Sequence, residues 1–247
     1  MRYLVLSDLH ANLQALETVM GAVPAGAYDR VLVLGDLVGY GASPNEVVEM
    51  VRAMDPLVVV RGNHDKVACG IEAPDEFNAM ARQAVLWTVK TLTPDNRDYL
   101  RALPAGPLPV GTRLEVCHGS PGDEDEYIFD GADAALAFDR ITRPVCLFGH
   151  THLPVAFARE RSRIEAHVPD QRGRVTVRVA PDTWYLINPG SVGQPRDGDV
   201  RAGFALVDDD AGTVELRRVD YPVALAQQAI RDAGLPLALA TRLGAGR

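Results

Sequence analysis

The chain has 247 residues, a formal net charge of -8, three cysteines and six histidines. Apolar residues make up 47% and charged residues 23%, which excludes a disordered, collagen-like or coiled-coil chain. No apolar run approaches the roughly 20 residues that a membrane helix needs, and the N-terminus lacks a signal-peptide pattern. The cysteines are odd in number, and no two of them form a CxxC motif. We therefore expect a cytoplasmic protein with no membrane partner, no disulfide framework and no cysteine-ligated zinc.

The first third of the chain alternates short apolar runs with segments of helical periodicity. The runs at 3–6, 31–34 and 57–60 have strand length, and the segments at 12–20 and 44–54 carry apolar residues at helical spacing. Pro44 suits the first turn of a helix, and Ser43 can cap it. This alternation predicts parallel strands joined by right-handed crossovers, with functional loops at the carboxyl ends of the strands.

The later part of the chain changes character twice. Residues 74–103 form a helical insertion, in which Pro74 opens one helix and Pro94 a second. Short β-rich runs then predict a second, more antiparallel sheet. These runs lie at 113–117, 145–148, 155–158, 175–179, 184–187, 204–207 and 214–218. The tail at 222–247 is predicted to be helical with a stop at Gly234, and without repeats or a linker we expect a single domain over 1–247.

Ligand-capable side chains follow five of the predicted strands. The segments are Asp8-Leu9-His10, Gly35-Asp36, Asn63-His64-Asp65, His118-Gly119 and Gly149-His150-Thr151-His152. Beyond a strand end, the two outer residues of Asp-x-His or His-x-His can converge on one ion. Each segment alone is more often a cap or a turn. Only His167 lies outside these segments, and their combination predicts a metal site.

In their order and types these segments resemble the motifs of the calcineurin-like metallophosphoesterase superfamily. Residues 7–12 (SDLHAN), 117–122 (CHGSPG) and 188–192 (NPGSV) are similar to its small bacterial and archaeal phosphoesterases. The resemblance implies an α/β (α+β) fold of two stacked mixed β-sheets flanked by helices, a four-layer αββα sandwich with a small helical insertion.

The same resemblance implies a role for each residue of the site. Asp8, His10 and His152 would bind one divalent metal ion, Asn63, His118 and His150 would bind the other, and Asp36 would bridge them. Manganese is the first expectation, and iron, zinc, cobalt and nickel also suit nitrogen and oxygen donors. A hydroxide between the ions would attack phosphorus. His64 would assist the leaving group, and Asp65 would orient His64 and raise its pKa.

Neighbouring residues have simpler interpretations. Asn12 could equally cap a helix or touch the site, and Arg196 is expected in an exposed loop. Cys117 and Cys146 are expected to pack in the core. The acidic run 123–126 is expected to be a solvated loop, and 188–191 to support the ligating histidines.

The predicted function is hydrolysis of phosphate monoesters or diesters of small or nucleotide-like molecules. Two alternatives are a nuclease and a non-catalytic scaffold with the same fold. The nuclease would use residues 159–178, which hold six arginines against three acids, but the acidic chain argues against nucleic acid as a partner. The complete ligand set argues against the scaffold.

Overall fold

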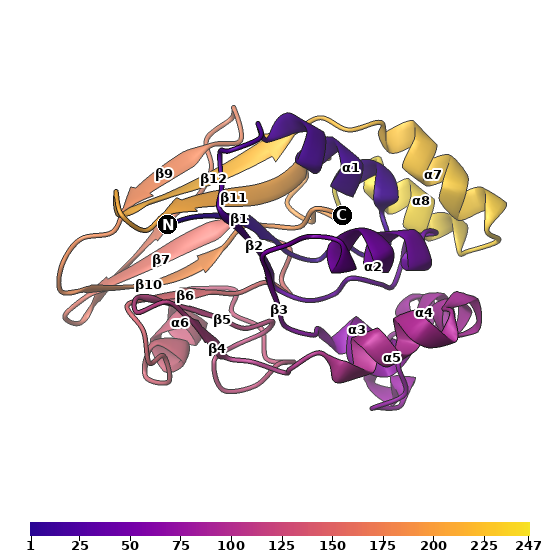
Figure 1. Ribbon diagram of the computed structural model, residues 1–247, viewed down its shortest axis with the longest axis horizontal. Helices are drawn as coiled ribbons and strands as arrows, with labels where there is room; N and C mark the ends of the chain where they lie inside the picture. The colour runs from indigo at the N-terminus through magenta and orange to yellow at the C-terminus, as the bar shows by residue number, and fades with distance from the viewer.

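Two six-stranded sheets stack face to face in the computed structural model, which describes residues 1–247 (Figure 1). The first sheet has the order β3 (Leu57–Val59), β2 (Arg30–Val33), β1 (Arg2–Leu6), β11 (Ala202–Asp208), β12 (Thr213–Val219) and β9 (Val175–Arg178). The second has the order β4 (Leu108–Val110), β5 (Leu114–Val116), β6 (Val145–Leu147), β10 (Thr183–Asn188), β7 (Val155–Glu160) and β8 (Arg163–His167).

Helices cover the outer faces of both sheets. Beside the first sheet lie α1 (Leu13–Ala22), α2 (Pro44–Arg52), α7 (Val223–Asp232) and α8 (Leu237–Leu243). The second sheet carries α6 (Gly131–Phe138). Between strand β3 and the second sheet the chain forms α3 (Asn63–Ala68), the 3-10 helix η1 (Pro74–Glu76), α4 (Ala79–Thr91) and α5 (Pro94–Ala102). None of these helices has the length and apolar composition that a membrane span requires.

Strand β1 shows how the layers are held together, because its side chains alternate between two apolar cores. Leu4 and Leu6 pack into the cluster beneath the outer helices, whereas Tyr3 and Val5 pack between the two sheets. A third cluster lies between the second sheet and α6 and includes Phe138. Apolar residues on both faces of a strand are what a four-layer αββα sandwich requires, and the predicted fold is confirmed.

The predicted parallel strands are confirmed, since β1 pairs with β2 and β2 with β3 in parallel register. The assignment of all later strands to a second sheet is wrong. β11 pairs antiparallel with the free edge of β1, and β12 and β9 extend the first sheet from there. Hydrophobic periodicity identifies a strand but carries no information about which distant strand pairs with it.

The helical insertion begins later than predicted. Pro74 opens only the 3-10 helix η1, and α4 starts at Ala79 because the Asn78 side chain accepts hydrogen bonds from the free backbone N–H groups of Met80 and Ala81. The helix predicted at Pro94 is confirmed as α5. The sequence pattern does not predict four of the elements, because most of them are too short to show a periodic spacing of apolar residues. These elements are α3, α6, β4 and β8.

Candidate metal centre

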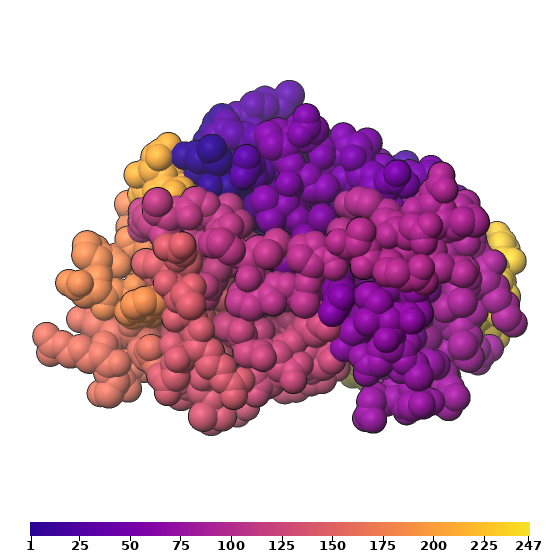
Figure 2. Space-filling model, turned by 60° about the horizontal axis from the view of Figure 1, so that its bottom comes forward, coloured from indigo at the N-terminus to yellow at the C-terminus, as the bar shows by residue number.

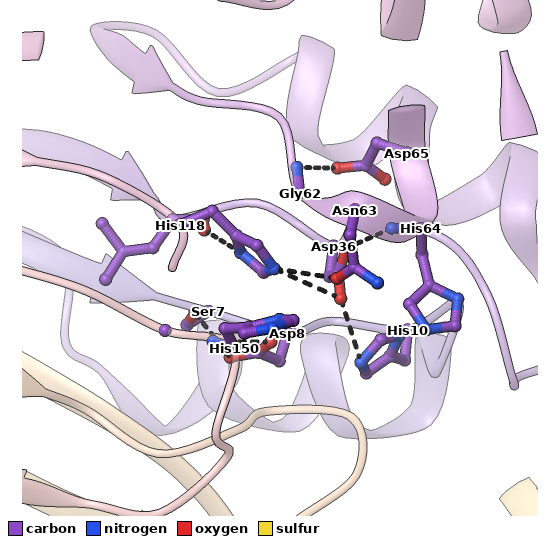
Figure 3. Close-up of polar contacts among 12 residues, drawn as sticks. Ser7, Asp8, His10, Asp36, Gly62, Asn63, His64, Asp65, His118 and His150 are labelled. Carbon is purple, nitrogen blue, oxygen red and sulfur yellow. Dashed lines mark hydrogen bonds and ion pairs between the residues drawn. The ribbon is translucent and has the colours of Figure 1, made fainter. Parts of the chain in front are cut away.

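The five predicted segments meet where the carboxyl ends of strands from both sheets converge. Asp8, Asp36 and Asn63 follow β1, β2 and β3, while His118 and His150 follow β5 and β6. The side chains point toward one another across the junction between the sheets (Figure 3). All except Asn63 are buried, so the molecule concentrates ionisable groups in its interior at this point.

The backbone at this junction is strained. Five of the expected ligands adopt the left-handed conformation, which non-glycine residues adopt rarely. Their φ angles are 52° at Asp8, 46° at His10, 53° at Asp36, 66° at His150 and 62° at His152. Such strain persists only where the surrounding structure fixes it, and it gathers at functional sites.

Asp8, His10, Asp36 and His152 form one group whose ligand atoms all lie within 4.8 Å of one another. The Nδ1–H of His10 donates to the carbonyl oxygen of Val38 at 3.1 Å, and that of His152 donates to the carbonyl of Gln194 at 2.6 Å. Each Nε2 atom therefore carries a bare lone pair in the neutral ring. These two Nε2 atoms lie 3.1 Å apart and face each other.

The second group contains Asp36, His118 and His150. His118 donates from Nδ1 to the carbonyl of Leu34 at 2.7 Å, and its Nε2 lies 3.5 Å from Asp36 Oδ2 and 3.2 Å from Asn63 Oδ1. His150 is held the other way round, because its Nε2 donates to the carbonyl of Asp125 at 3.1 Å and leaves Nδ1 free. Asp36 belongs to both groups.

The donor atoms of both groups fit divalent metal ions. In the first group two bare imidazole lone pairs face each other, an arrangement that repels unless a proton or a cation lies between them. The donors are nitrogen and oxygen atoms without a thiolate, which suits first-row transition metals. Backbone carbonyls fix the orientation of every imidazole ring in the two groups, as is typical of metal sites.

Burial controls the protonation of these groups in the protein chain alone. It lowers the pKa of His150 to about 3 and the pKa values of His10 and His152 well below their usual range, so all three rings are neutral. Burial alone would raise the pKa of Asp36, but His118 beside it holds that pKa well below normal. Asp36 in turn overcomes the effect of burial on His118 and raises the pKa of this imidazole to about 10.

His64 lies beside the ligands without joining either group. Its backbone N–H donates to Asp36 Oδ1 at 2.9 Å, and its ring packs between Tyr40 and Phe77, with ring centroids at 4.4 and 4.5 Å. The buried Nδ1 of His64 has no hydrogen-bond partner. Burial lowers the pKa of His64 to about 4, so the ring is neutral near pH 7.

Asp65 does not have the role expected of it. Its Oδ1 accepts from the backbone N–H of Val38 at 3.1 Å and its Oδ2 from that of Gly62 at 3.0 Å, so the carboxylate ties two loops together. The expectation that it orients the His64 ring and raises its pKa is wrong, because both oxygens face backbone donors and the His64 pKa is lowered. Asp65 is a neighbour of His64 in sequence but points into the junction of the loops.

The loop 188–191 supports the site as expected. Asn188 Nδ2 donates to the carbonyl of Gly149 at 2.7 Å and to Thr151 Oγ1 at 3.0 Å, which fixes the two residues that alternate with His150 and His152. Ser191 Oγ donates to the carbonyl of Asp8 at 2.8 Å. These contacts hold the ligating backbone in its strained conformation.

Hydrogen bonds and ion pairs also decide the expectations for Asn12 and for the acidic run 123–126. Asn12 caps α1, since its Oδ1 accepts from the N–H of Ala15 at 3.2 Å. The acidic run 123–126 is not a free solvated loop: Glu124 pairs with Arg61 at 3.0 Å, Asp125 pairs with Lys66 at 2.5 Å, and the carbonyl of Asp125 orients His150. Charge patterning alone could not show these partners.

A cavity of about 90 Å³ opens onto the ligands and contains residues that sequence reasoning missed or misjudged. The aromatic residues Tyr40, Phe77 and Tyr127 line it beside His64. Arg196 also lines it, so the prediction that Arg196 lies in an exposed loop is wrong. No short motif marks these aromatic residues, because they reach the site only through the fold. The basic segment 159–178 does not line this cavity and lies at the opposite end of the molecule from α3, α4 and α5 (Figure 2).

Comparisons with known proteins agree with this geometry. A family model described as the calcineurin-like phosphoesterase superfamily domain matches residues 1–212. An uncharacterized protein of Methanocaldococcus jannaschii is 36% identical over 98% of this chain and 97% of its own. The phosphodiesterase YfcE of Escherichia coli is 24% identical over 87% of this chain and 91% of its own. The crystal structure of a metallophosphoesterase from Sphaerobacter thermophilus is 43% identical, with a TM-score of 0.89, and the match covers 100% of this chain and 99% of that one.

Proposed function

Because this chain belongs to the calcineurin-like phosphoesterase superfamily and is a metal-dependent phosphoesterase, we propose that it hydrolyses phosphate esters of small, nucleotide-like molecules at a centre of two metal ions. Phosphodiesters are the expected class, since a relative is named a phosphodiesterase. The observation that carries the proposal is the pair of donor groups that share Asp36, with bare Nε2 atoms on His10 and His152 in the first group and a free Nδ1 on His150 in the second.

In this proposal Asp8, His10 and His152 hold one ion, and Asn63, His118 and His150 hold the other, with Asp36 between them. Manganese is proposed first, with iron, zinc, cobalt and nickel as alternatives. When bound, such ions supply positive charge that stabilises the phosphoryl oxygens in the transition state, and they make water more acidic. The ligands themselves stay rigid, because backbone carbonyls hold each ring.

His64 is proposed to act on the leaving oxygen. The imidazole is neutral, lies beside both donor groups and lines the cavity that opens onto them. A neutral ring donates a hydrogen bond to an oxygen on which negative charge develops, and this bond stabilises the charge while the proton stays on the ring. Tyr40 and Phe77 pack against the ring and restrict it to one orientation.

Exposed aromatic rings support a nucleotide-like leaving group. Tyr127 stacks on His150 with ring centroids 3.9 Å apart and on Phe129 at 5.0 Å. Tyr127 and Phe129 are 43% and 56% exposed, so they offer a flat apolar surface at the edge of the site. A nucleobase stacks on such a surface. The nuclease alternative is not favoured, because the basic segment 159–178 lies away from this edge.

The test is metal reconstitution with a matched pair of variants. The protein is freed of metal with a chelator and titrated with Mn²⁺ by calorimetry, and hydrolysis of bis(4-nitrophenyl) phosphate and 4-nitrophenyl phosphate is followed. Asp36→Asn removes the shared carboxylate at φ 53°, and Asp182→Asn makes the same change at an exposed residue with φ 60°.

We expect two equivalents of bound metal and faster diester than monoester cleavage in the wild-type protein. Asp36→Asn is expected to lose at least one equivalent and most of the activity, since a bridging carboxylate offsets the repulsion of two cations about 4 Å apart. Asp182→Asn should behave as wild type. One equivalent in the wild-type protein, or full activity of Asp36→Asn, would contradict the two-ion proposal.

A further inference from the structure

Arg196 is a cationic side chain in the wall of the cavity that opens onto the metal ligands. Asp36, His64 and His152 line the same cavity, so the guanidinium borders the space that both donor groups and the neutral His64 ring share. After burial, the charge of Arg196 is the largest cause of the lowered pKa of His152, which reflects how near this charge lies to the ligand. The loop after Ser191 thus brings a permanent positive charge to the candidate metal centre.

No carboxylate of the protein pairs with Arg196. Its Nη2 donates to the side chain of Gln194 at 3.1 Å, and its buried Nε has no hydrogen-bond partner. The acid next to it in sequence is engaged elsewhere, since Asp197 pairs with Arg218. Arg196 is half-buried, and a partly desolvated cation without a counter-ion destabilises the fold by itself. An anion bound in the cavity would compensate this charge.

The fold restricts the position of the guanidinium before any ligand binds. Gln194 is buried, its N–H donates to Ser191 Oγ at 2.7 Å, and its carbonyl accepts from His152 Nδ1 at 2.6 Å. The guanidinium carbon of Arg196 also lies 5.7 Å from the centre of the Tyr40 ring, a distance at which a cation is attracted to an aromatic face. A side chain held in this way loses little freedom when it binds an anion.

Tyr40 also links Arg196 to the residues proposed to act on the substrate. Its ring packs against His64 with centroids 4.4 Å apart and against His10 at 4.7 Å. One aromatic ring therefore contacts a proposed metal ligand, the proposed donor to the leaving oxygen, and the arginine. The cavity that they surround measures only about 90 Å³, so a phosphoryl group that enters it lies close to all of its walls.

A guanidinium suits the oxygens of a reacting phosphoryl group. Its planar donors can bind two oxygens at once, and its charge is permanent. While the attacking oxygen approaches phosphorus and the leaving oxygen departs, negative charge is spread over the non-bridging oxygens, and donors directed at that charge lower the barrier. Arg196 would keep all of its protons during this step, whereas His64 donates to the leaving oxygen.

We propose that Arg196 is a further catalytic residue, which binds a non-bridging oxygen of the reacting phosphoryl group and stabilises its charge in the transition state. This role rests on the proposed function, because that function brings the phosphoryl group to the metal centre. Binding of an oxoanion by Arg196 needs no turnover, so the two proposals can be tested separately.

The first experiment measures binding without a reaction. The full chain is loaded with Mn²⁺, with its Mn²⁺ affinity measured by calorimetry, and is then titrated with inorganic phosphate. The variants are Arg196→Gln and the conservative Arg196→Lys. The control is Arg231→Gln, which changes the net charge by the same amount, because Arg231 is an exposed residue of α7 that bonds only to Gln228.

We expect phosphate to bind the wild-type protein and Arg196→Gln to raise the Kd about tenfold or more, the equivalent of one lost charged hydrogen bond. Arg196→Lys keeps the charge but loses the planar donors, so its Kd should lie in between. Arg231→Gln should match wild type. A wild-type protein that does not bind phosphate, or equal Kd values for wild type and Arg196→Gln, would overturn the proposal.

The Mn²⁺ affinity distinguishes direct contact with the phosphoryl group from support of the loop. Arg196→Gln removes a positive charge beside the ions, so Mn²⁺ should bind as tightly as in wild type or more tightly. If Arg196 only held Gln194, and through its carbonyl His152, the variant would instead lose Mn²⁺ affinity, and that loss would overturn the proposal. Thermal unfolding shows that each variant is folded.

The second experiment follows hydrolysis of bis(4-nitrophenyl) phosphate by the Mn²⁺-loaded proteins. Arg196→Gln should lower kcat/KM by about 10- to 100-fold, and kcat itself should fall, because the contact strengthens as the transition state forms. An unchanged kcat with a higher KM would refute the catalytic role. If the wild-type protein cleaves no ester with any metal, the proposed hydrolase function fails, while the phosphate titration still decides whether Arg196 binds the oxoanion.

Discussion

Asp65 offers the most direct test of how the loops around the metal centre are held. The residue is fully buried, and its two carboxylate oxygens accept from the backbone N–H groups of Val38 and Gly62. Asp65→Ala leaves both donors buried without a partner. The Val38 carbonyl orients His10, and Gly62 precedes Asn63, so the change reaches one proposed ligand of each metal ion.

The expected magnitude follows from the two lost hydrogen bonds. Burial raises the pKa of Asp65 to about 7, so near neutral pH its hydrogen bonds lie between the neutral range of about 0.5–1.5 kcal/mol and the charged range of about 1.5–3 kcal/mol. Asp65→Ala should therefore lower the unfolding free energy by about 2–4 kcal/mol. Asp65→Asn keeps one acceptor but turns an N–H toward the second donor, and should lower it by about 2–3 kcal/mol. Metal affinity should fall about 10- to 100-fold, as is typical when a group that positions the ligands is lost.

Urea unfolding of the metal-free protein measures the first effect, and competition with a fluorescent chelator measures the second. Asp75→Ala is the control, because the Asp75 side chain is 74% exposed and forms only a loose ion pair at 3.7 Å. If Asp65→Ala kept its stability and metal affinity but shifted the pH dependence of catalysis, Asp65 would be acting on His64 and the assignment to the loops would be refuted.

Three further predictions concern His64 and the buried thiols. Gly39→Ala places a Cβ 2.9 Å from His64 Cγ and should lower kcat by up to about 100-fold, because the ring is displaced. Gly26→Ala is the control, since Gly26 has a similar φ and open space around it, and it should lower stability alone. Equal kcat values for the two variants would contradict this prediction. In the metal-free protein the His64 imidazole should titrate near 4 by NMR. Since this lies below its unfolded value of 6.5, its contribution to stability is complete above pH 6.5 and is lost as the pH falls toward 4. His64→Gln should weaken this trend in the urea unfolding data without abolishing it, because the pKa values of His10, His150 and His152 are lowered too. Cys117 and Cys146 are buried and should react with a thiol reagent only after unfolding; fast labelling of the native protein would contradict their packing in the core.

Local sequence patterns determined the strands, most helices and the donor types of the site. The spacing of apolar residues gave β1, β2, β3, α1 and α2, because each period reports burial within one short segment. The ordered segments from Asp8 to His152 identified the expected ligands, since each follows a strand whose end is visible in the sequence. The fold class followed from the resemblance that these segments carry.

Tertiary structure alone decided the contacts between distant segments. It set β11 beside β1, turned the Asp65 carboxylate toward Val38, and brought Arg196 and Arg242 to Tyr40. It also selected which nitrogen of each histidine faces inward, because that choice depends on a carbonyl from another loop. Periodicity reports only whether a side chain is buried. Its partner depends on how the layers pack, and that information lies in no single segment of the chain.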